Sequence, residues 1–524
     1  MLSKVRNRFI AGALAVSASA ALLAISPVGS AGAAQSGSDP TAVLKMSAIV
    51  GPSQDPIRAT QTCEITTLNT IYDKLFAIGK DGAIEPRLAT SYEVRPDNVV
   101  RLDLRTGVKF QDNTPFDADA VKFNLDRAMT DPASTIKGFL SSVESVTVVN
   151  PTTVDIKMKT PSAGNLLVSL TDRAGMMASP TAVKAAGSSV AFSAAPVGSG
   201  MYKVEGTWTA RQKLSVRAWD GYWDKSAAKL GGIDFMDVVL GSRANAVATG
   251  DVDVAGLDSV AVANTLKGNE DVELITSTSP QYRLFILNET LPPLDNLKVR
   301  QAISYAIDRD AIATILTLGV SKAAYQQFPP GNPAYVKALD KMYPYNPTLA
   351  KKMLAEAGFP NGFTLQAAVG AQSPTYIQVG EVIQQQLKAV GIDMQFSLID
   401  QATAFANIVI RGQWQASPFG GIVSADPSTD FANHFLTGGS INAGGNEAPG
   451  VRALMEEAGA STDAKERAKL YKKANRLVVE NVQDGVPLVF DPSLIVIHPY
   501  VKGITPGQVD CNFNFRGVSI SKNR

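Results

Sequence analysis

Hydrophobic and polar positions alternate between Asn98 and Phe110, which is the period of a half-buried strand. Three apolar side chains would share one side of it: Val100, Leu102 and Leu104. Turn residues follow, and the period then changes to that of an amphipathic helix whose N-cap is predicted at Asp117. One face of this helix would carry Ala118, Val121, Leu125 and Ala128.

Helix and strand patterns also alternate later in the chain. The segment 295–312 predicts a helix with Asp295 as a candidate cap, and its apolar face holds Val299, Ala302, Ile303 and Ala306. The segment 345–369 predicts a helix that Gly358 ends, followed by a strand. Residues 377–400 repeat this helix–glycine–strand order. The alternation indicates an α/β protein.

The first 34 residues have the pattern of a cleavable export signal. A basic start precedes an apolar run, 9–25, and "AGA" at 31–33 satisfies the small-residue cleavage rule. An uncleaved membrane anchor is the alternative. No cysteine follows the apolar run, so no lipid anchor is predicted. We expect a mature protein exported to the periplasm or the extracellular space.

Composition is that of a folded soluble protein of two or three domains. The chain has 524 residues, with 45% hydrophobic and 19% charged residues. Formal net charge is +1, so nothing indicates nucleic acid as a partner.

Chemistry-bearing motifs are not apparent in the sequence. The two histidines, His434 and His498, stand alone, and neither zinc-site spacing, a phosphate-binding loop nor a nucleophile elbow occurs. We therefore expect no metal, no cofactor and no catalytic residues, and an enzyme is the third hypothesis, behind two kinds of receptor. The two cysteines, Cys63 and Cys511, permit one disulfide in an exported chain.

Several segments, in this order, resemble the peptide/nickel family of extracellular solute-binding proteins, also called family 5, whose members serve ABC importers. The resemblance covers nearly the whole mature chain. It rests on "RTGVKFQDNTPFDADAVKFNLDRA", "VGSGMYKV" with "RAWDGYW", "DNLKVRQAISYAIDRDAI", "YNPTLAKKMLAEAGFPNGF", "ADPSTDF" and "ERAKLYKKANRLVVE".

The resemblance implies an α/β fold with two lobes of the periplasmic-binding-protein type (type II, cluster C). After the signal peptide at about 1–33, lobe one would hold about 35–278, with an extra subdomain at about 80–195. Lobe two would hold about 279–489, and about 490–524 would return to lobe one. The hinge would cross at 277–285 and return at 486–493, and Cys63 and Cys511 would then share a lobe and form the disulfide.

The implied function is capture of a peptide or other small organic solute between the lobes and its delivery to a membrane permease. We expect a monomer. The alternative is a solute- or peptide-sensing, or chaperone-like, receptor of the same fold without a transport role.

Candidate ligand-binding residues follow from the resemblance. They are Thr62, Glu64, Tyr282, Arg283, Trp414, Phe419, Val423 and Asp426. Each has a structural alternative: Asp426 as a turn cap, Trp414 as core, Arg283 as partner of a lobe carboxylate. Arg283 is otherwise suited to clamp a solute carboxylate.

Val423 marks a departure from the peptide-binding members, which resemble one another in having an aspartate three residues before the acidic residue of the acidic-Pro pair. That pair is Asp426–Pro427 here. Because an ammonium without a partner is costly to bury, ordinary peptides with free amino ends are disfavoured.

Overall fold

The computed structural model describes residues 37–59, 62–79, 82–257, 259–504 and 513–522. The signal peptide predicted at about 1–33 and the predicted cleavage site lie outside these residues. Between Ser38 and the C-terminal region the chain forms one compact unit.

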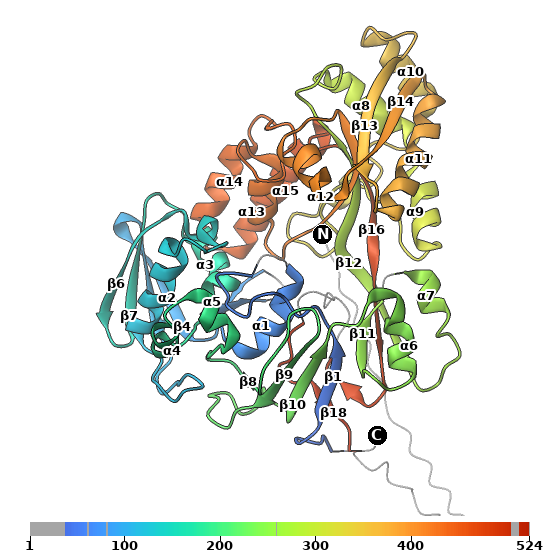
Figure 1. Ribbon diagram of the computed structural model, residues 1–524. Coiled ribbons are helices and arrows are strands. Elements are labelled where there is room, and N and C mark those ends of the chain that lie inside the picture. Colours follow the sequence, from blue (N-terminus) through green and yellow to red (C-terminus); the bar gives the residue numbers. More distant parts are fainter. Residues whose placement is uncertain (1–36, 60–61, 80–81, 258, 505–512, 523–524) are drawn as a thin grey trace, which may run out of the picture. The chain divides into compact units, whose positions relative to one another are not determined.

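A ten-stranded sheet runs through this unit (Figure 1). From one edge to the other its strands are β14 (Ile392–Ile399), β13 (Phe363–Gly370), β15 (Ala416–Ile422), β12 (Glu273–Leu287), β16 (Val486–Ile497), β11 (Val254–Gly256), β1 (Val43–Ser47), β10 (Gly232–Met236), β9 (Lys213–Ala218) and β8 (Tyr202–Val204). The first three strands belong to lobe two and the last five to lobe one.

The strands β12 and β16 connect the two lobes. They are long, and they pair antiparallel from Glu273–Ile497 to Phe285–Val486. The pairing shifts between Thr278 and Tyr282, so the ladder is interrupted midway along both strands. A second shift follows between Arg283 and Leu284, so the pairing of β12 with β16 is irregular over this part of both strands.

Lobe one carries an extra subdomain with its own sheet and core. The sheet has the order β4 (Ala89–Arg95), β5 (Val99–Leu104), β7 (Thr153–Met158) and β6 (Val143–Asn150). Small two-stranded sheets pair β2 (Phe76–Ile78) with β3 (Ile84–Pro86) and β17 (Val501–Lys502) with β18 (Ser519–Ile520).

Helices cover both faces of the main sheet and pack on the subdomain (Figure 1). Those of lobe one are α1 (Ile65–Ile71), α2 (Ala118–Thr130), α3 (Ala163–Ser169), α4 (Pro180–Ala186), α5 (Ser189–Ala194), α6 (Arg243–Ala248) and α7 (Val260–Asn264). Those of lobe two are α8 (Leu297–Ala306), α9 (Arg309–Thr317), α10 (Pro347–Glu356), α11 (Pro374–Lys388), α12 (Gln401–Phe405), α13 (Pro427–Asp430), α14 (Val451–Ala460) and α15 (Ala464–Glu480).

Short helical turns complete the secondary structure. They are η1 (Thr62–Glu64), η2 (Pro96–Asn98), η3 (Lys137–Leu140), η4 (Arg173–Gly175), η5 (Leu240–Ser242), η6 (Lys337–Leu339), η7 (Ala406–Ile410) and η8 (Phe431–Phe435).

The elements predicted from local pattern agree with the structure, except that the segment 295–312 forms two helices, α8 and α9, separated at Ile307 and Asp308. Val100, Leu102 and Leu104 of β5 are buried, and Asp117 caps α2 by accepting a hydrogen bond from Ala120 N at 3.0 Å. The apolar face predicted for 295–312 is the buried face of α8. Its predicted cap is wrong by one residue, because the side chain of Asn296, not Asp295, accepts from Lys298 N.

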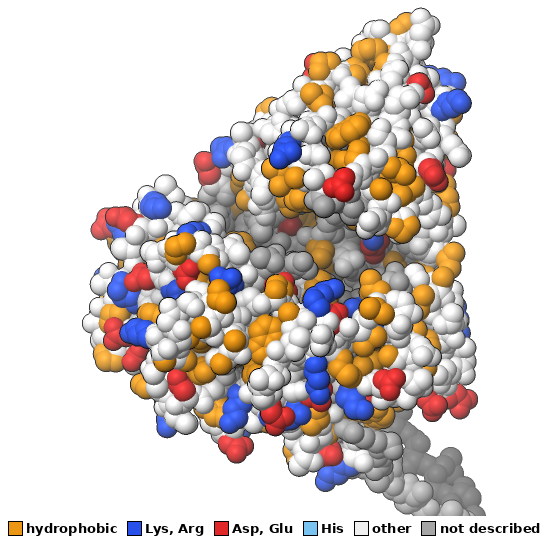
Figure 2. All heavy atoms as spheres, in the orientation of Figure 1, with side chains coloured by type: hydrophobic (Ala, Val, Ile, Leu, Met, Phe, Trp, Pro, Cys, Tyr) orange, Lys and Arg blue, Asp and Glu red, His pale blue; other side chains and the backbone are white. Residues whose placement is uncertain are grey.

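The fold class is therefore the predicted one, a two-lobed α/β protein with an extra subdomain in lobe one. The residue boundaries predicted for the lobes stay predictions. On the face that Figure 2 shows, Lys and Arg side chains alternate with Asp and Glu, so neither sign forms a large patch there.

Candidate functional site

Both lobes contribute to a cavity of about 660 Å³ beside the hinge strands. From lobe one it is lined by the carboxyl ends of β1 and β11, by η1 and by the segment 237–243. From lobe two it is lined by the C-terminal end of α9 and the start of α11. Carboxyl ends of parallel strands are the usual place for ligands in α/β sheets, and β1 pairs parallel to both β10 and β11.

The cavity wall is part polar and part apolar. Charged lining residues are Arg211, Asp237, Arg243, Arg283 and Asp491. Hydroxyl and amide side chains come from Ser47, Ser259, Ser279, Gln281, Thr317, Thr375, Gln378 and Ser493. Apolar side chains come mainly from 238–240, Val260, Ile315 and Leu316. Such a wall suits a small organic solute that has both polar and apolar groups.

Arg283 is the one predicted ligand residue that lines this cavity, and its guanidinium group is engaged. Its Nε and Nη2 donate to the two carboxylate oxygens of Asp491 at 3.1 and 2.6 Å. The guanidinium also stacks over Tyr376 of α11, 5.0 Å from the ring centroid. Arg283 thus links β12 to β16 beside the hinge. A solute carboxylate could bind to Arg283 in the same way only by displacing Asp491.

Asp426 is held by buried partners from α15. Its carboxylate accepts hydrogen bonds from Arg467 Nη2 at 2.9 Å and Tyr471 Oη at 2.8 Å. It also caps α13 by accepting from Ser428 N at 2.9 Å. This geometry fits the alternative given for Asp426 in the sequence analysis, a residue that caps a turn and does not bind the ligand.

Four further predicted residues pack in or against the core of lobe two. Tyr282 is buried, and its hydroxyl lies 3.5 Å from His434 Nε2. Val423 is also buried, and its N–H donates to Pro280 O at 2.9 Å. Phe419 lies against Phe405. Trp414 packs on the same core as a partly buried residue.

The structure brings five predicted residues of lobe two to one region. Phe419 pairs with Leu284 in the β12–β15 ladder, next to Tyr282 and Arg283, and Val423 and Asp426 follow at the end of β15. Trp414 lies before β15, at the opposite end of that strand.

The two predicted residues of lobe one lie in η1. Glu64 is buried beneath Gly51, where an added Cβ would come within 2.5 Å of Glu64 Cγ. Thr62 begins η1. Between them, Cys63 is the residue that lines the cavity. Its predicted partner, Cys511, lies outside the described residues.

Residues that the sequence did not reveal are Ser47, Asp237, Ser493 and Gln378. All four line the cavity, from four different elements or segments. The signal that could have found Ser47 is its position at the end of the short apolar segment that forms β1, whereas the other three come together only through the sheet order.

A buried polar cluster lies under the end of β15. His434 Nδ1 is 3.2 Å from Asp484 Oδ2, and Asp430 accepts from Ser424 N at 3.0 Å. Burial raises the pKa of Asp430 to about 7, against the opposing effect of His434. Burial lowers the pKa of His434, but its hydrogen bond to Asp484 and the charges of Asp484 and Asp430 together outweigh this and leave the pKa raised. Burial also raises the pKa of Glu289 to about 7.

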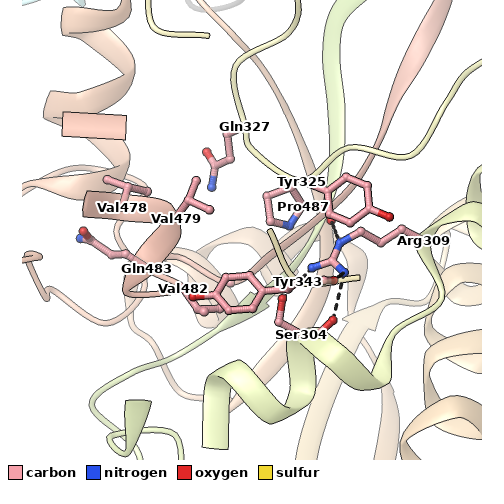
Figure 3. A pocket seen from close by; sticks show the side chains of 11 residues that line it. Ser304, Arg309, Tyr325, Gln327, Tyr343, Val478, Val479, Val482, Gln483 and Pro487 are labelled. Atoms are coloured by element: carbon pink, nitrogen blue, oxygen red, sulfur yellow. Dashed lines mark hydrogen bonds between the residues drawn. The ribbon is translucent and has the colours of Figure 1, made fainter. Parts of the chain in front are cut away.

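A second, much smaller cavity of about 10 Å³ lies inside lobe two (Figure 3). Arg309 beside it donates to Ser304 O, Ser304 Oγ and Tyr343 O at 2.9, 2.6 and 3.0 Å. Burial lowers the pKa of Arg309 to about 10. The space suffices for about one water molecule, so this cavity is part of the packing of α8 and α9 against β16.

Neither a metal centre nor a membrane span is found in the described part of the chain. Its His, Cys, Asp and Glu side chains nowhere gather in groups of three or more that could hold a metal ion. His498, for example, stacks on Tyr500. Within the same residues, every helix is too short or too polar to cross a bilayer.

Comparison with known proteins gives one consistent family. The family described as "Bacterial extracellular solute-binding proteins, family 5 Middle" matches residues 83–443. The glutathione-binding protein GsiB of Escherichia coli strain K12 is 31% identical over 483 residues, which cover 89% of this chain and 92% of GsiB.

Solved structures show the same fold. AgaA from A. tumefacien R10, solved with agropinic acid, has a TM-score of 0.75 at 25% identity and covers 92% of this chain and 99% of its own. HbpA2 from Haemophilus parasuis has a TM-score of 0.80 at 24% identity and covers 92% of this chain and 100% of its own. The chain therefore belongs to family 5 of the bacterial extracellular solute-binding proteins, the substrate-binding components of ABC importers.

Proposed function

We propose that this protein captures a small organic solute in the cavity beside its hinge and delivers it to the permease of an ABC importer. The observation that carries the proposal is that both lobes and both hinge strands line one cavity large enough for such a solute. Binding there would hold the lobes together, because the solute contacts both. The protein acts as a monomeric receptor and does not turn its ligand over.

Lobe one is assigned to about 35–278 with 490–524, and lobe two to about 279–489. The interruption of the β12–β16 ladder between Thr278 and Tyr282 supports a hinge at this boundary. Arg283 and Asp491 lie directly beside it and would keep the two hinge strands in register while the lobes move.

The solute is a small organic molecule, or a peptide whose amino end is not a free α-ammonium group. Val423 is buried among apolar side chains where peptide-binding members carry a carboxylate, and Asp426 is already paired with Arg467. The relatives support a broad choice: GsiB is named for glutathione, and AgaA was solved with agropinic acid.

The test is mass spectrometry of solutes released by denaturing protein purified from its native host, followed by calorimetry with the compounds identified. A single class of small solute that binds back at a 1:1 ratio is expected. Turnover of that solute, or failure of any released compound to bind, would contradict the proposed function.

Export follows from the proposed role, since the solute is captured outside the cytoplasm. N-terminal sequencing of the exported protein is expected to place the mature start close to Ala34. A start far downstream of Gln35, or retention in membranes after a salt wash, would contradict this.

Val423→Asp is expected to raise affinity for dipeptides with free amino ends by about ten- to a hundred-fold, because a charge-assisted hydrogen bond contributes about 1.5–3 kcal/mol. Calorimetry with Met-Leu and its N-acetyl form would measure this. Since Val423 is buried, the variant should also lose stability, by about 1–3 kcal/mol. Val423→Thr, of similar size but uncharged, is the control; equal gains in both variants would show that charge is not the cause.

The disulfide between Cys63 and Cys511 is part of the same proposal. Cys63 is not a free thiol. The segment that follows Cys511 lies against α1, next to Cys63: Phe513 N donates to Thr66 Oγ1 at 3.3 Å, and Asn69 Nδ2 donates to Phe513 O at 3.0 Å.

Reducing this disulfide is expected to cost about 2–5 kcal/mol of unfolding free energy, because it closes a very long loop. Peptide mapping without reductant should recover the linked pair, and urea unfolding with and without reductant should measure the difference. Two free thiols in the native oxidised protein would rule the bond out. Cys63→Ser should abolish the effect of the reductant.

A further inference from the structure

Three residues that line the cavity each have a buried side-chain oxygen without a hydrogen-bond partner in the described part of the chain. These oxygens are Ser47 Oγ, Asp237 Oδ2 and Ser493 Oγ. Buried polar atoms are almost always paired in native proteins, and leaving one unpaired costs stability. Three such atoms in residues that line one cavity point to a molecule bound there as their partner.

The sheet places these atoms on the lobe-one and hinge side of the cavity. Ser47 ends β1 and pairs with Met236, so Asp237, the next residue, lies beside it. Ser493 is on the hinge strand β16 and pairs with Ser277 of β12. Backbone ladders therefore fix the main chain at or next to all three residues, and a rotation of each side chain would turn its oxygen toward a ligand.

Asp237 forms an ion pair with Arg211, and the contact is weak. Arg211 Nε lies 3.4 Å from Asp237 Oδ2, beyond a good hydrogen bond, and the Arg211 side chain is 63% exposed whereas that of Asp237 is 8% exposed. An exposed arginine at this distance contributes little and can be displaced. The carboxylate is therefore able to accept a hydrogen bond from a ligand.

The rim of the same cavity is apolar. Val239 and Leu240 of lobe one and Ile315 of lobe two line it and are all exposed large hydrophobic residues. Exposed apolar side chains from both lobes at one cavity suit an apolar part of a ligand, which would cover them on binding.

We propose that Ser47, Asp237 and Ser493 form a subsite for a hydrogen-bond-donating group of the solute, an ammonium or a hydroxyl, while Val239, Leu240 and Ile315 contact its apolar part. This inference rests on the proposed function. Asp237 is an acceptor, and the two hydroxyls can donate or accept, so together they select a donor-rich group over a carboxylate. An ammonium other than the free amino end of a peptide would thus be anchored in lobe one, whereas the carboxylate that would hold a peptide amino end is still absent at Val423.

The test is calorimetry of the full-length mature protein with four probes: glutathione, Met-Leu, N-acetyl-Met-Leu and agropinic acid, together with any solute released from the purified protein. The variants are Ser47→Ala, Asp237→Asn and Ser493→Ala. The matched control is Asp234→Asn, on the same strand as Met236 but paired with Arg217 at 2.9 Å and outside the cavity lining.

For an ammonium-bearing probe, Asp237→Asn is expected to weaken binding about ten- to a hundred-fold, and each serine variant about five- to ten-fold. For a probe that offers only hydroxyls, Asp237→Asn should weaken binding less than five-fold, because the amide oxygen still accepts. The control should change affinity less than two-fold. Ser47→Ala and Ser493→Ala should keep or raise Tm, since each removes a buried hydroxyl that has no protein partner.

A different result would overturn the subsite. One such result is that all three variants bind every ligand of the wild type within two-fold, while Gln378→Ala, on the lobe-two side, weakens binding. The cavity would then be the binding site, but water and not the ligand would form the hydrogen bonds to these three atoms. A drop in Tm in both serine variants with unchanged affinity would assign the hydroxyls a structural role. If no probe and no released solute binds the wild type, the proposed function fails, and this subsite fails with it.

Discussion

Arg467→Ala is expected to lower the free energy of unfolding by about 3–5 kcal/mol, because it leaves the buried carboxylate of Asp426 without its cation. The two side chains are 6% and 7% exposed, and their atoms are 2.9 Å apart. The Arg467 guanidinium also donates to Ala458 O at 2.6 Å, which holds the turn between α14 and α15. Urea unfolding at neutral pH measures the loss.

The same substitution should weaken solute binding as well. Asp426 caps α13 at the end of the loop that begins at Val423, so losing its partner loosens that loop. The turn also meets the subdomain of lobe one, since a Cβ added to Gly164 would lie 2.1 Å from Ser461 O. Arg467 therefore supports a contact between the lobes in addition to the loop.

Arg476→Ala is the matched control for this prediction. Arg476 is on the same helix, α15, and pairs with Glu480 at 3.6 Å, but both side chains are 40% exposed or more. Its removal should cost less than about 1 kcal/mol. Equal losses in the two variants would show that burial of the Arg467–Asp426 pair is not what makes it important.

Asp430→Asn is expected to flatten the dependence of stability on pH between about 5 and 8. Burial raises the pKa of Asp430 from 3.8 to about 7 in the folded state. Its contribution to stability is complete below pH 3.8 and is lost as pH rises to 7, because the unfolded state ionises this carboxyl in that range while the folded state keeps it protonated. From pH 3.8 to 7 the total loss is on the order of 4 kcal/mol, of which about 3 kcal/mol falls above about pH 5.

Groups that face Asp430 modify this dependence. His434 favours its ionised form, whereas Asp426 opposes it. The pKa of His434 is itself raised, so its contribution is also lost as pH rises. The wild type should therefore lose stability from pH 5 to pH 8 more steeply than Asp430→Asn, and the variant should keep the slope due to the other groups with a raised pKa, His434 and Glu289 among them.

Urea unfolding at several pH values between 5 and 8 measures both slopes. Asp463→Asn is the control, because hydrogen bonds from Glu466 N and Lys465 N lower the pKa of this exposed N-cap, so it titrates below the range. Identical slopes in the wild type and Asp430→Asn would show that Asp430 is ionised throughout and would refute the prediction.

The sequence by itself determined the elements whose residues interact locally. The alternation of β5, the buried face of α8 and the Asp117 cap of α2 depend on side chains a few positions apart, so period and turn chemistry suffice to locate them. Even the error at Asp295 is local, since two adjacent residues with similar capping ability compete for one position.

The order of segments, compared with a known family, also indicated two lobes and a cavity between them. It did not determine what the candidate residues do there. Asp426 was a possible ligand anchor until Arg467 and Tyr471, 41 and 45 positions later, were found to occupy its carboxylate. Arg283 was a possible carboxylate clamp, but Asp491, 208 positions away, fills its guanidinium fork.

Only the tertiary structure decided which atoms meet at the cavity. The cavity brings together Ser47, Asp237 and Ser493, which lie far apart in the sequence and share no local pattern. They become neighbours because β1, β10 and β16 belong to one sheet. Whether a polar side chain is available to a ligand depends on the partners that long-range packing brings to it. Those partners cannot be read from the residue type or from its neighbours in the sequence.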